Sequence, residues 1–214
     1  MASTVHFNPK AKSWRYADAP AGLQDGESHV LQFHRQLPDY NETPLHSLPS
    51  LATELGLGHV LIKDESSRFG LPSFKILGAS WAVFRAVVDR LGLGLPSPAA
   101  MELKELGAQA RESGLRIVTC TEGNWGRAVS RMANRMGIPV VVYVPSHMPE
   151  TTRDLIRGEG ASVVPVEGDY DAAVEVAKKK ASANKHLLVM DISWEGFEMV
   201  PQVRSCGYSF SLAL

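Results

Sequence analysis

From Leu115 onward, the chain alternates between short apolar runs and segments whose apolar residues recur every three or four positions. Runs of the first kind are typical of buried strands, and segments of the second kind are typical of amphipathic helices. The predicted strands are residues 115–120, 138–145, 161–166 and 186–192, and the predicted helices are residues 126–137, 149–160 and 169–183. Strands that alternate with helices are joined by right-handed crossovers, so the sequence predicts an α/β fold with a parallel sheet and helices on both of its faces.

The predicted helix over residues 126–137 carries the clearest periodicity. Its apolar face consists of Ala128, Val129, Met132 and Met136. Gly137 follows directly and is a typical stop signal for a helix. We expect this face to be covered in the folded protein.

The part of the chain before Leu115 is less regular. Residues 1–40 are polar, contain several prolines and show little periodicity, so they predict an irregular N-terminal arm. A helical stretch is predicted from Leu51, followed by a short strand over residues 59–65 with an apolar centre. A loop then leads into a helix that begins near Phe74.

A candidate binding loop, TEGNWG, occupies residues 121–126 between the first strand of the alternating segment and the helix that follows. Ligands of parallel sheets bind beyond the carboxyl ends of the strands. Gly123 and Gly126 would let the backbone approach a ligand closely, and Asn124 adds a side-chain donor and acceptor. Alternatively, the glycines only shape a tight turn that Asn124 caps. The chain contains neither GxGxxG nor GxxxxGK[ST], so dinucleotides and nucleoside triphosphates are disfavoured.

Lys75 is a second candidate, because it stands where a helix is predicted to begin. A helix N-terminus carries a partial positive charge, so a cation is mildly disfavoured there. The residue either points into water, as most lysines do, or is held in place for chemistry.

Composition and charge disfavour several classes of protein. The 214 residues are 44% hydrophobic and 21% charged, and 22 basic against 23 acidic side chains leave a net charge of −1. This balance creates no bulk field for nucleic acid or anionic lipid. The first twenty residues lack the apolar stretch of a signal peptide and no run reaches the length of a membrane span, so we expect a cytoplasmic protein.

Metal and disulfide sites are also disfavoured by the sequence. Cys120 and Cys206 are too few for a disulfide framework or a zinc site. The seven histidines are scattered without ligand spacing, so we predict no metal.

The two stretches that contain these candidates, Lys75 and the TEGNWG loop, make the chain similar to a known superfamily. KDESSRFGLPSFKILGAS, residues 63–80, followed by TEGNWGRAV, resembles the fold-type II pyridoxal-phosphate enzymes, which include tryptophan synthase β-subunits, serine and threonine dehydratases and cysteine synthases. Within that superfamily the likeness is strongest to the diaminopropionate ammonia-lyase family. The further matching motifs are TPL at residues 43–45 and DISWEGF at residues 191–197, and the likeness runs from about Tyr40 to Gln202.

This resemblance implies how a cofactor would be held. Lys75 would form a Schiff base with pyridoxal phosphate, which requires the neutral amine that a helix N-terminus and partial burial favour. Asn124 would hydrogen-bond the 3′ oxygen of the cofactor, while Gly123 and Gly126 would let the loop lie against the substrate carboxylate. Trp125 stands where the family usually has histidine, which removes a polar ring from this neighbourhood.

The resemblance also implies a reaction and its catalytic residues. The activity would be α,β-elimination of an amino acid, with 2,3-diaminopropionate giving pyruvate and ammonia. Lys75 would serve one face of Cα and Glu122, in place of the usual aspartate, the other face, with Asp191 near the substrate. A serine or threonine dehydratase or a cysteine lyase is the neighbouring alternative. The partners expected are a small amino acid and, as one option, a second copy of the chain.

The family pattern divides the chain into parts. After the arm over 1–40, residues 41–102 would begin the larger domain with the cofactor lysine, 103–192 would form the smaller α/β domain, and 193–214 would return to the larger one.

The family binds the cofactor phosphate with a glycine-rich loop and contacts the pyridine nitrogen with a further residue. In the family sequence, both elements come after the last segment that this chain matches. We therefore expect a truncated chain with an incomplete larger domain, an exposed strand edge near Val60 and weak cofactor binding. The last residues, VRSCGYSFSLAL, are atypical for the family. A non-catalytic fragment that pairs with a full-length relative is therefore the alternative hypothesis.

Overall fold

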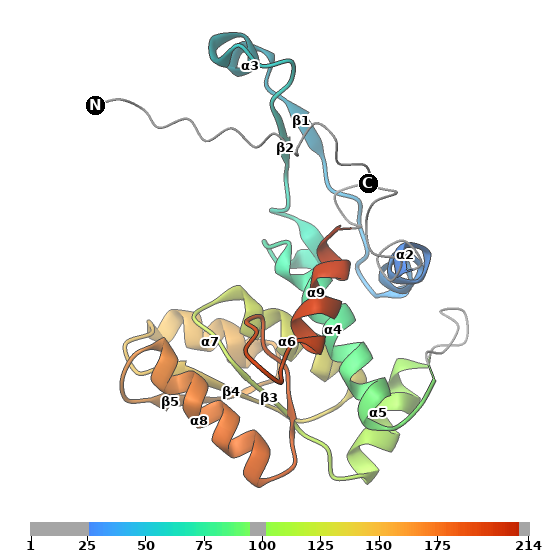
Figure 1. Ribbon diagram of the computed structural model, residues 1–214, viewed down its shortest axis with the longest axis vertical. Helices are drawn as coiled ribbons and strands as arrows, with labels where there is room; N and C mark the ends of the chain where they lie inside the picture. Colours follow the sequence, from blue (N-terminus) through green and yellow to red (C-terminus); the bar gives the residue numbers. More distant parts are fainter. Residues whose placement is uncertain (1–25, 95–101, 210–214) are drawn as a thin grey trace.

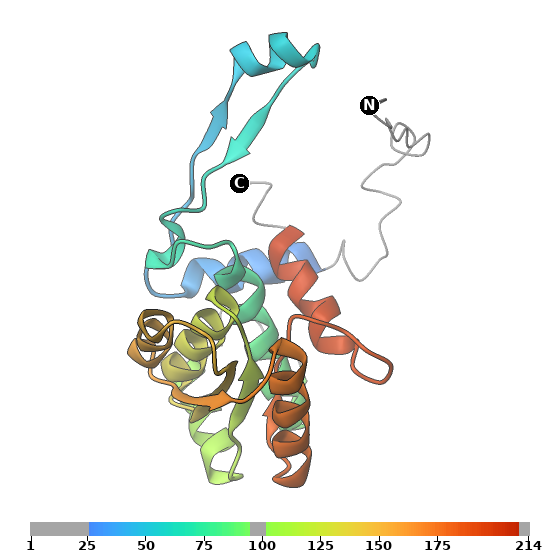
Figure 2. The ribbon, with the colours of Figure 1, turned by 90° about the vertical axis from the view of Figure 1, so that its left-hand side faces the viewer.

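A computed structural model describes residues 26–94 and 102–209. Its body is a parallel sheet with helices on both faces, and a two-stranded ribbon extends away from that body (Figures 1 and 2). The helices are α2 (Gly26–Gln36), α3 (Pro49–Leu55), α4 (Lys75–Arg90), α5 (Leu103–Glu112), α6 (Asn124–Met136), α7 (Glu150–Gly158), α8 (Tyr170–Ala183) and α9 (Met199–Ser209), with a 3-10 turn, η3 (Arg68–Gly70). The strands are β1 (Leu45–Ser47), β2 (Leu61–Lys63), β3 (Ile117–Cys120), β4 (Val140–Pro145), β5 (Ser162–Val166) and β6 (Leu187–Leu188).

The four later strands form the parallel sheet, in the order β5-β4-β3-β6. Ile117 is in register with Val140 on one side and with Leu187 on the other. All neighbouring pairs are parallel, so the predicted α/β architecture is confirmed. The last strand is shorter than predicted, although Val189 still donates a hydrogen bond to the carbonyl of Val118 at 2.9 Å.

The two faces of the sheet are covered by different helices, as the alternation of side chains along a strand requires. Ile117, Val140, Val142 and Val144 pack in one core cluster with residues of α4 and α6. Val118, Cys120 and Tyr143 pack in a second cluster with α8. The predicted apolar face of α6 is fully buried, and Gly137, with φ 70°, ends that helix as predicted.

The prediction of an irregular arm over residues 1–40 is wrong for residues 26–36, which form α2; residues 1–25 lie outside the described part of the chain. Val30, Phe33 and Leu37 are buried at helical spacing. The Phe33 ring lies 5.2 Å from that of Trp81 and 5.0 Å from that of Phe84, so α2 packs on α4. Three apolar residues among polar ones were too sparse a signal to predict this helix.

The ribbon consists of β1 and β2 in antiparallel pairing, with α3 at its tip (Figure 2). Within the described residues β2 pairs with β1 alone, which agrees with the expected exposed edge. Several aliphatic side chains of this segment are exposed, namely Leu45, Leu51, Leu55, Leu57, Leu61 and Ile62. No helix in the described ranges is long and apolar enough to cross a bilayer.

Candidate active site

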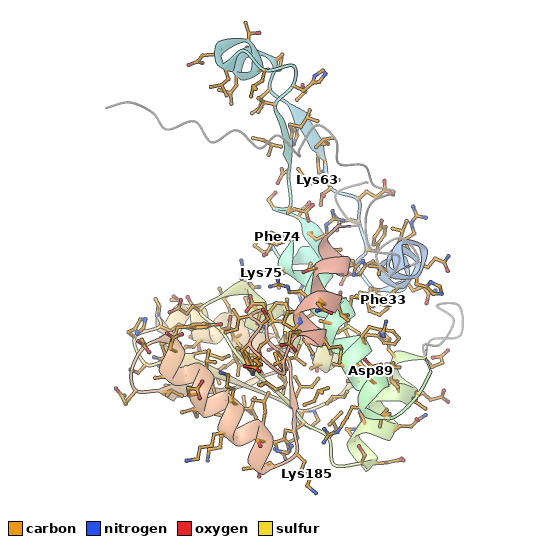
Figure 3. All side chains as sticks on the ribbon, in the orientation of Figure 1. Phe33, Lys63, Phe74, Lys75, Asp89 and Lys185 are labelled. Atoms are coloured by element: carbon orange, nitrogen blue, oxygen red, sulfur yellow. The ribbon has the colours of Figure 1, made fainter. Side chains whose placement is uncertain are left out.

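A cavity of about 270 Å³ lies where the carboxyl ends of β3 and β6 meet the first residues of α4 and α8. Its lining consists of Lys75, Thr121, Glu122, Gly123, Asn124, Trp125, Tyr170 and Asp191. Figure 3 places Lys75 at the end of α4 nearer the ribbon, with Lys185 far away at the opposite side of the body. The cavity therefore collects residues from four separate segments at the edge of the sheet where ligands are expected.

Lys75 does not point freely into water. Its Nζ lies 3.3 Å from Oδ2 of Asp191, and the two side chains are 36% and 15% exposed. The two residues are 116 positions apart in the sequence. The fold thus joins two of the residues that were predicted from separate motifs into one ion pair.

The start of α4 is fixed by the segment that precedes it. The backbone N–H of Lys75 donates to Oγ of Ser73 at 3.2 Å, which satisfies one of the unpaired donors at the helix N-terminus. Further upstream, Phe69 and Gly70 have left-handed φ values of 49° and 68°. The Phe69 N–H donates to Oδ1 of Asn41 at 2.8 Å. A constrained turn therefore directs the chain into the lysine.

The motifs TPL, KDES and RFG contact one another at the base of the ribbon. The buried Arg68 donates from Nε to Glu65 Oε2 at 2.7 Å and from Nη2 to Thr43 Oγ1 at 2.6 Å. Thr43 in turn donates to Glu65 Oε1 at 2.7 Å. Burial alone would raise the pKa of Glu65, but hydrogen bonds from Arg68 and Thr43 lower it below its usual range. These motifs lie outside the cavity lining and stabilise the approach to Lys75.

The TEGNWG loop is organised by Thr121, a residue that sequence reasoning missed. Its Oγ1 accepts the N–H groups of Gly123 and Gly126, both at 3.0 Å. A Cβ at position 126 would collide with Cγ2 of Thr121 and crowd Cγ1 of Val142 on β4, so the close packing of the loop favours glycine here, and Gly126 does not line the cavity. A Cβ at position 123 would meet no atom within 4 Å, and Gly123 borders the cavity together with Asn124.

Trp125 combines a place in the cavity lining with a place in the core. Its side chain is almost fully buried, and Nε1 donates to Oγ1 of Thr119 at 3.1 Å. The indole N–H is therefore engaged by a buried residue that does not line the cavity. Trp125 thus contributes an apolar ring to the cavity lining.

Glu122 and Tyr170 complete the lining. The Glu122 side chain is 57% exposed, and its Oε1 lies 3.8 Å from Nε2 of His147. Tyr170 begins α8, and burial together with the nearby Asp191 raises the pKa of its phenol. Sequence reasoning missed Tyr170, although its position in the connection from β5 to α8, at the carboxyl edge of the sheet, was a signal that could have identified it.

The charges around the cavity are unevenly distributed. Among the described lining residues Lys75 is the only cation, against the carboxylates of Glu122 and Asp191. Asn124 is the first residue of α6, so the positive end of that helix also faces the cavity. Within the ranges that the structure covers, no group of His, Cys, Asp and Glu is arranged to hold a metal ion.

Comparison with known proteins identifies the family. The family profile described as pyridoxal-phosphate dependent enzyme matches residues 37–204. This chain belongs to that family. Diaminopropionate ammonia-lyase of Salmonella typhimurium strain LT2 is 37% identical over 203 residues, which cover 94% of this chain and 50% of that protein. The chain spans about half the length of the curated relatives it matches.

Solved structures of this family agree with the fold. The crystal structure of Escherichia coli diaminopropionate ammonia lyase in apo form has a TM-score of 0.79 at 29% identity, covering 91% of this chain and 52% of that one. The same enzyme in complex with an aminoacrylate-PLP azomethine reaction intermediate has a TM-score of 0.78 at 29% identity, covering 91% and 48%.

The residues present fit part of pyridoxal phosphate, the cofactor of this family. Lys75 offers a primary amine to an aldehyde, and Asn124 offers an amide donor to a ring oxygen. The N-terminus of α6 favours an anionic group. The described lining holds no second cation for the phosphate dianion, so the fit concerns the aldehyde and the ring.

Proposed function

We propose that this chain carries the residues for pyridoxal-phosphate-dependent elimination on a small amino acid, with 2,3-diaminopropionate as the substrate and pyruvate and ammonia as products. The observation that supports the proposal is the convergence of Lys75, Asn124 and Asp191 on one cavity. Two curated relatives that share 37% and 32% identity with the chain are diaminopropionate ammonia-lyases.

Proton transfer at one face of the substrate is assigned to Lys75. When bound, the cofactor withdraws electrons from the amino acid and makes its Cα–H bond acidic enough to break. The Lys75 amine can take up that proton because it lines the cavity and a neutral amine is a base. Asp191, 3.3 Å away, would stabilise the ammonium that results. Its carboxylate thus acts on the charge that develops on the base.

The other polar groups are assigned to orientation. The N-terminus of α6, at Asn124, would hold the substrate carboxylate, because helix N-termini bind anions. The raised pKa of Tyr170 keeps its phenol protonated, so it can donate a hydrogen bond into the cavity. Glu122 would serve the opposite face of Cα and could exchange its proton with water through its exposed side.

Covalent trapping tests the proposal directly. The purified chain is mixed with pyridoxal phosphate, reduced with borohydride, digested and analysed by mass spectrometry. We expect one pyridoxyl group, on Lys75, because this amine lies in the cavity. The label should be absent from the Lys75→Arg variant and unchanged in Lys185→Arg, which replaces an exposed lysine away from the cavity. Scattered labelling of exposed lysines, or none, would contradict the proposal and favour the non-catalytic alternative.

Substitution of Glu122 tests the assignment of the second face. In Glu122→Gln the carboxylate is lost, so kcat/KM for one enantiomer of 2,3-diaminopropionate should fall about a hundredfold, in the range for loss of a general base. The rate with the other enantiomer should change little, because Lys75 serves that face. Glu167→Gln is the matched control, since Glu167 is exposed, follows β5 and does not line the cavity. Equal losses with both enantiomers would exclude a face-specific role for Glu122.

A further inference from the structure

We infer that Arg131 is a positioning residue that fixes Lys75 relative to the TEGNWG loop by binding the turn Arg68–Gly70 to α6. The inference rests on the proposed function of Lys75. Arg131 does not line the cavity and touches no reacting group. Its proposed role is to set the distance between two parts of the site that come from different segments of the chain.

Arg131 uses three nitrogens in two directions. Its Nη1 donates to the carbonyl of Phe69 at 2.6 Å. Its Nε and Nη2 donate to Oε2 and Oε1 of Glu159, both at 2.7 Å. A bidentate pair of this kind restricts the orientation of the guanidinium plane. The Glu159 side chain is only 10% exposed, so the residue that directly follows α7 supplies a shielded anchor for the arginine.

The turn held by Arg131 is one that needs outside support. Phe69 has a φ of 49°, a left-handed conformation that is strained for a bulky residue without a special reason to adopt it. Asn41 accepts the Phe69 N–H at 2.8 Å, and Arg131 donates to the Phe69 carbonyl. Hydrogen bonds on both sides of the residue thus hold this conformation. Lys75 lies shortly after the turn, so a shift of Phe69 would move the start of α4.

Because Arg131 and Asn124 lie on the same helix, α6, the Arg131–Phe69 hydrogen bond can affect the cavity. Asn124 begins that helix and borders the cavity, and Arg131 follows about two helical turns later on the same rigid element. Lys75 belongs to α4, which follows the turn. The Arg131–Phe69 hydrogen bond therefore links the element that carries Asn124 to the segment that carries Lys75. Loosening it should allow the two residues to drift apart without removing either.

A comparison of Arg131→Lys with Arg127→Lys tests the inference. Arg127 also contacts Glu159, with Nη2 3.0 Å from Oε1, and lies on the same helix, which makes it a matched control. Lysine keeps the charge but cannot reproduce two parallel hydrogen bonds and a third donor. The turn should therefore lose the support of a fixed arginine only in Arg131→Lys.

Two readouts on the full chain distinguish positioning from general stability. The first is the rate at which formaldehyde and cyanoborohydride methylate Lys75, relative to Lys185, measured without any cofactor. The second is the affinity for pyridoxal phosphate by titration. Arg131→Lys should raise the relative methylation rate severalfold, because the Lys75–Asp191 pair loosens, and weaken cofactor binding about tenfold. Arg127→Lys should leave both values unchanged.

The outcomes separate the inference from the proposed function. A chain that never labels at Lys75 with pyridoxal phosphate contradicts the proposed function, while the methylation ratio still decides the role of Arg131. A lowered melting temperature with an unchanged methylation ratio would mean a purely structural role and overturn the inference. If Arg131→Lys does not fold, Glu159→Gln takes its place, because it weakens the anchor and leaves the Phe69 contact. It should shift both readouts in the same direction by a smaller amount, and no shift would overturn the inference.

Discussion

Gly107→Ala is expected to lower the free energy of unfolding by at least about 3 kcal/mol, a large fraction of the stability of a typical domain. A Cβ at this position would lie 1.7 Å from the carbonyl oxygen of Met136 and 2.6 Å from its carbonyl carbon. The neighbour is backbone, so it cannot move aside as a flexible side chain would. The better helix propensity of alanine offsets only about 1 kcal/mol of this cost.

The Met136 carbonyl accepts a hydrogen bond from Nη1 of Arg111 at 3.4 Å, so a shift that relieved the clash would disturb this contact between α5 and α6. Met136 belongs to the last turn of α6, directly before Gly137 with its left-handed φ of 70°. Arg111 on α5 donates from Nη1 to the carbonyl of Gly137 at 2.8 Å. Moving α5 away from α6 would therefore also break this contact and open the core around Ala110 and Leu106.

Urea unfolding followed by circular dichroism measures the effect, with Gly158→Ala as the matched control. Gly158 ends α7, and a Cβ there would meet no atom within 4 Å. Alanine at that position should be neutral or stabilise the protein by about 0.5–1 kcal/mol. An unchanged midpoint for Gly107→Ala would show that α5 and α6 do not approach as closely as the structure has them.

The alternating segment was predictable because each of its signals is local. Apolar runs marked β3 and β4, and the period of Ala128, Val129 and Met132 identified the buried face of α6. Side-chain alternation follows directly from strand geometry, so the burial of both sheet faces followed as well.

Three helices, α2, α5 and α9, were not predicted, and for α2 and α5 the structure shows a physical reason. In α2 the apolar positions are separated by polar residues and preceded by a proline-containing stretch. In α5 the central Gly107 reads as a helix-weakening residue, whereas its absent side chain is what allows the backbone of α6 to come close. The need for glycine at position 107 comes from the backbone of α6, so the residues next to it in the sequence do not reveal it.

The site was only partly predictable from the sequence. Lys75, Asn124 and Asp191 were named from motifs, but no periodicity in the chain predicts that Lys75 and Asp191 come within 3.3 Å. The contact of Arg131 with Phe69 spans 62 positions and was likewise not predicted. Tertiary contacts of this kind depend on how helices pack on the sheet, and local patterns carry no information about them.

Lowering the pH from 7 to 4 is expected to remove about 3 kcal/mol of stability through His34 alone. This residue of α2 is fully enclosed, and its Nε2 lies 2.9 Å from the carbonyl of Leu77. Burial, together with the charge of Arg68, lowers the pKa of His34 from its usual 6.5 to about 4, although the hydrogen bond to Leu77 opposes the shift. The folded protein therefore keeps this imidazole neutral over a range in which the unfolded chain binds a proton.

The sign of the effect follows from that difference. Above about pH 6.5 neither state protonates His34 and the full stability is present. As the pH falls from 6.5 towards 4, the unfolded chain binds one more proton, so stability decreases by up to about 1.4 kcal/mol per pH unit. Glu65 and Glu159 have lowered pKa values, so their contribution is lost only below the usual carboxylate range. The slope of the free energy of unfolding against pH, between pH 6.5 and 5, therefore reflects the titration of histidine.

Urea unfolding at several pH values between 7 and 5 measures this slope. His34→Gln can keep a donor towards Leu77 without titrating, so it should flatten the pH dependence. Burial and the charges of Arg116 and Arg90 also lower the pKa of His186, so His186→Gln removes the smaller contribution of that residue. Equal slopes for His34→Gln and the unmodified chain would mean that His34 is accessible to protons in the folded state, and that α2 does not seal the core beside α4.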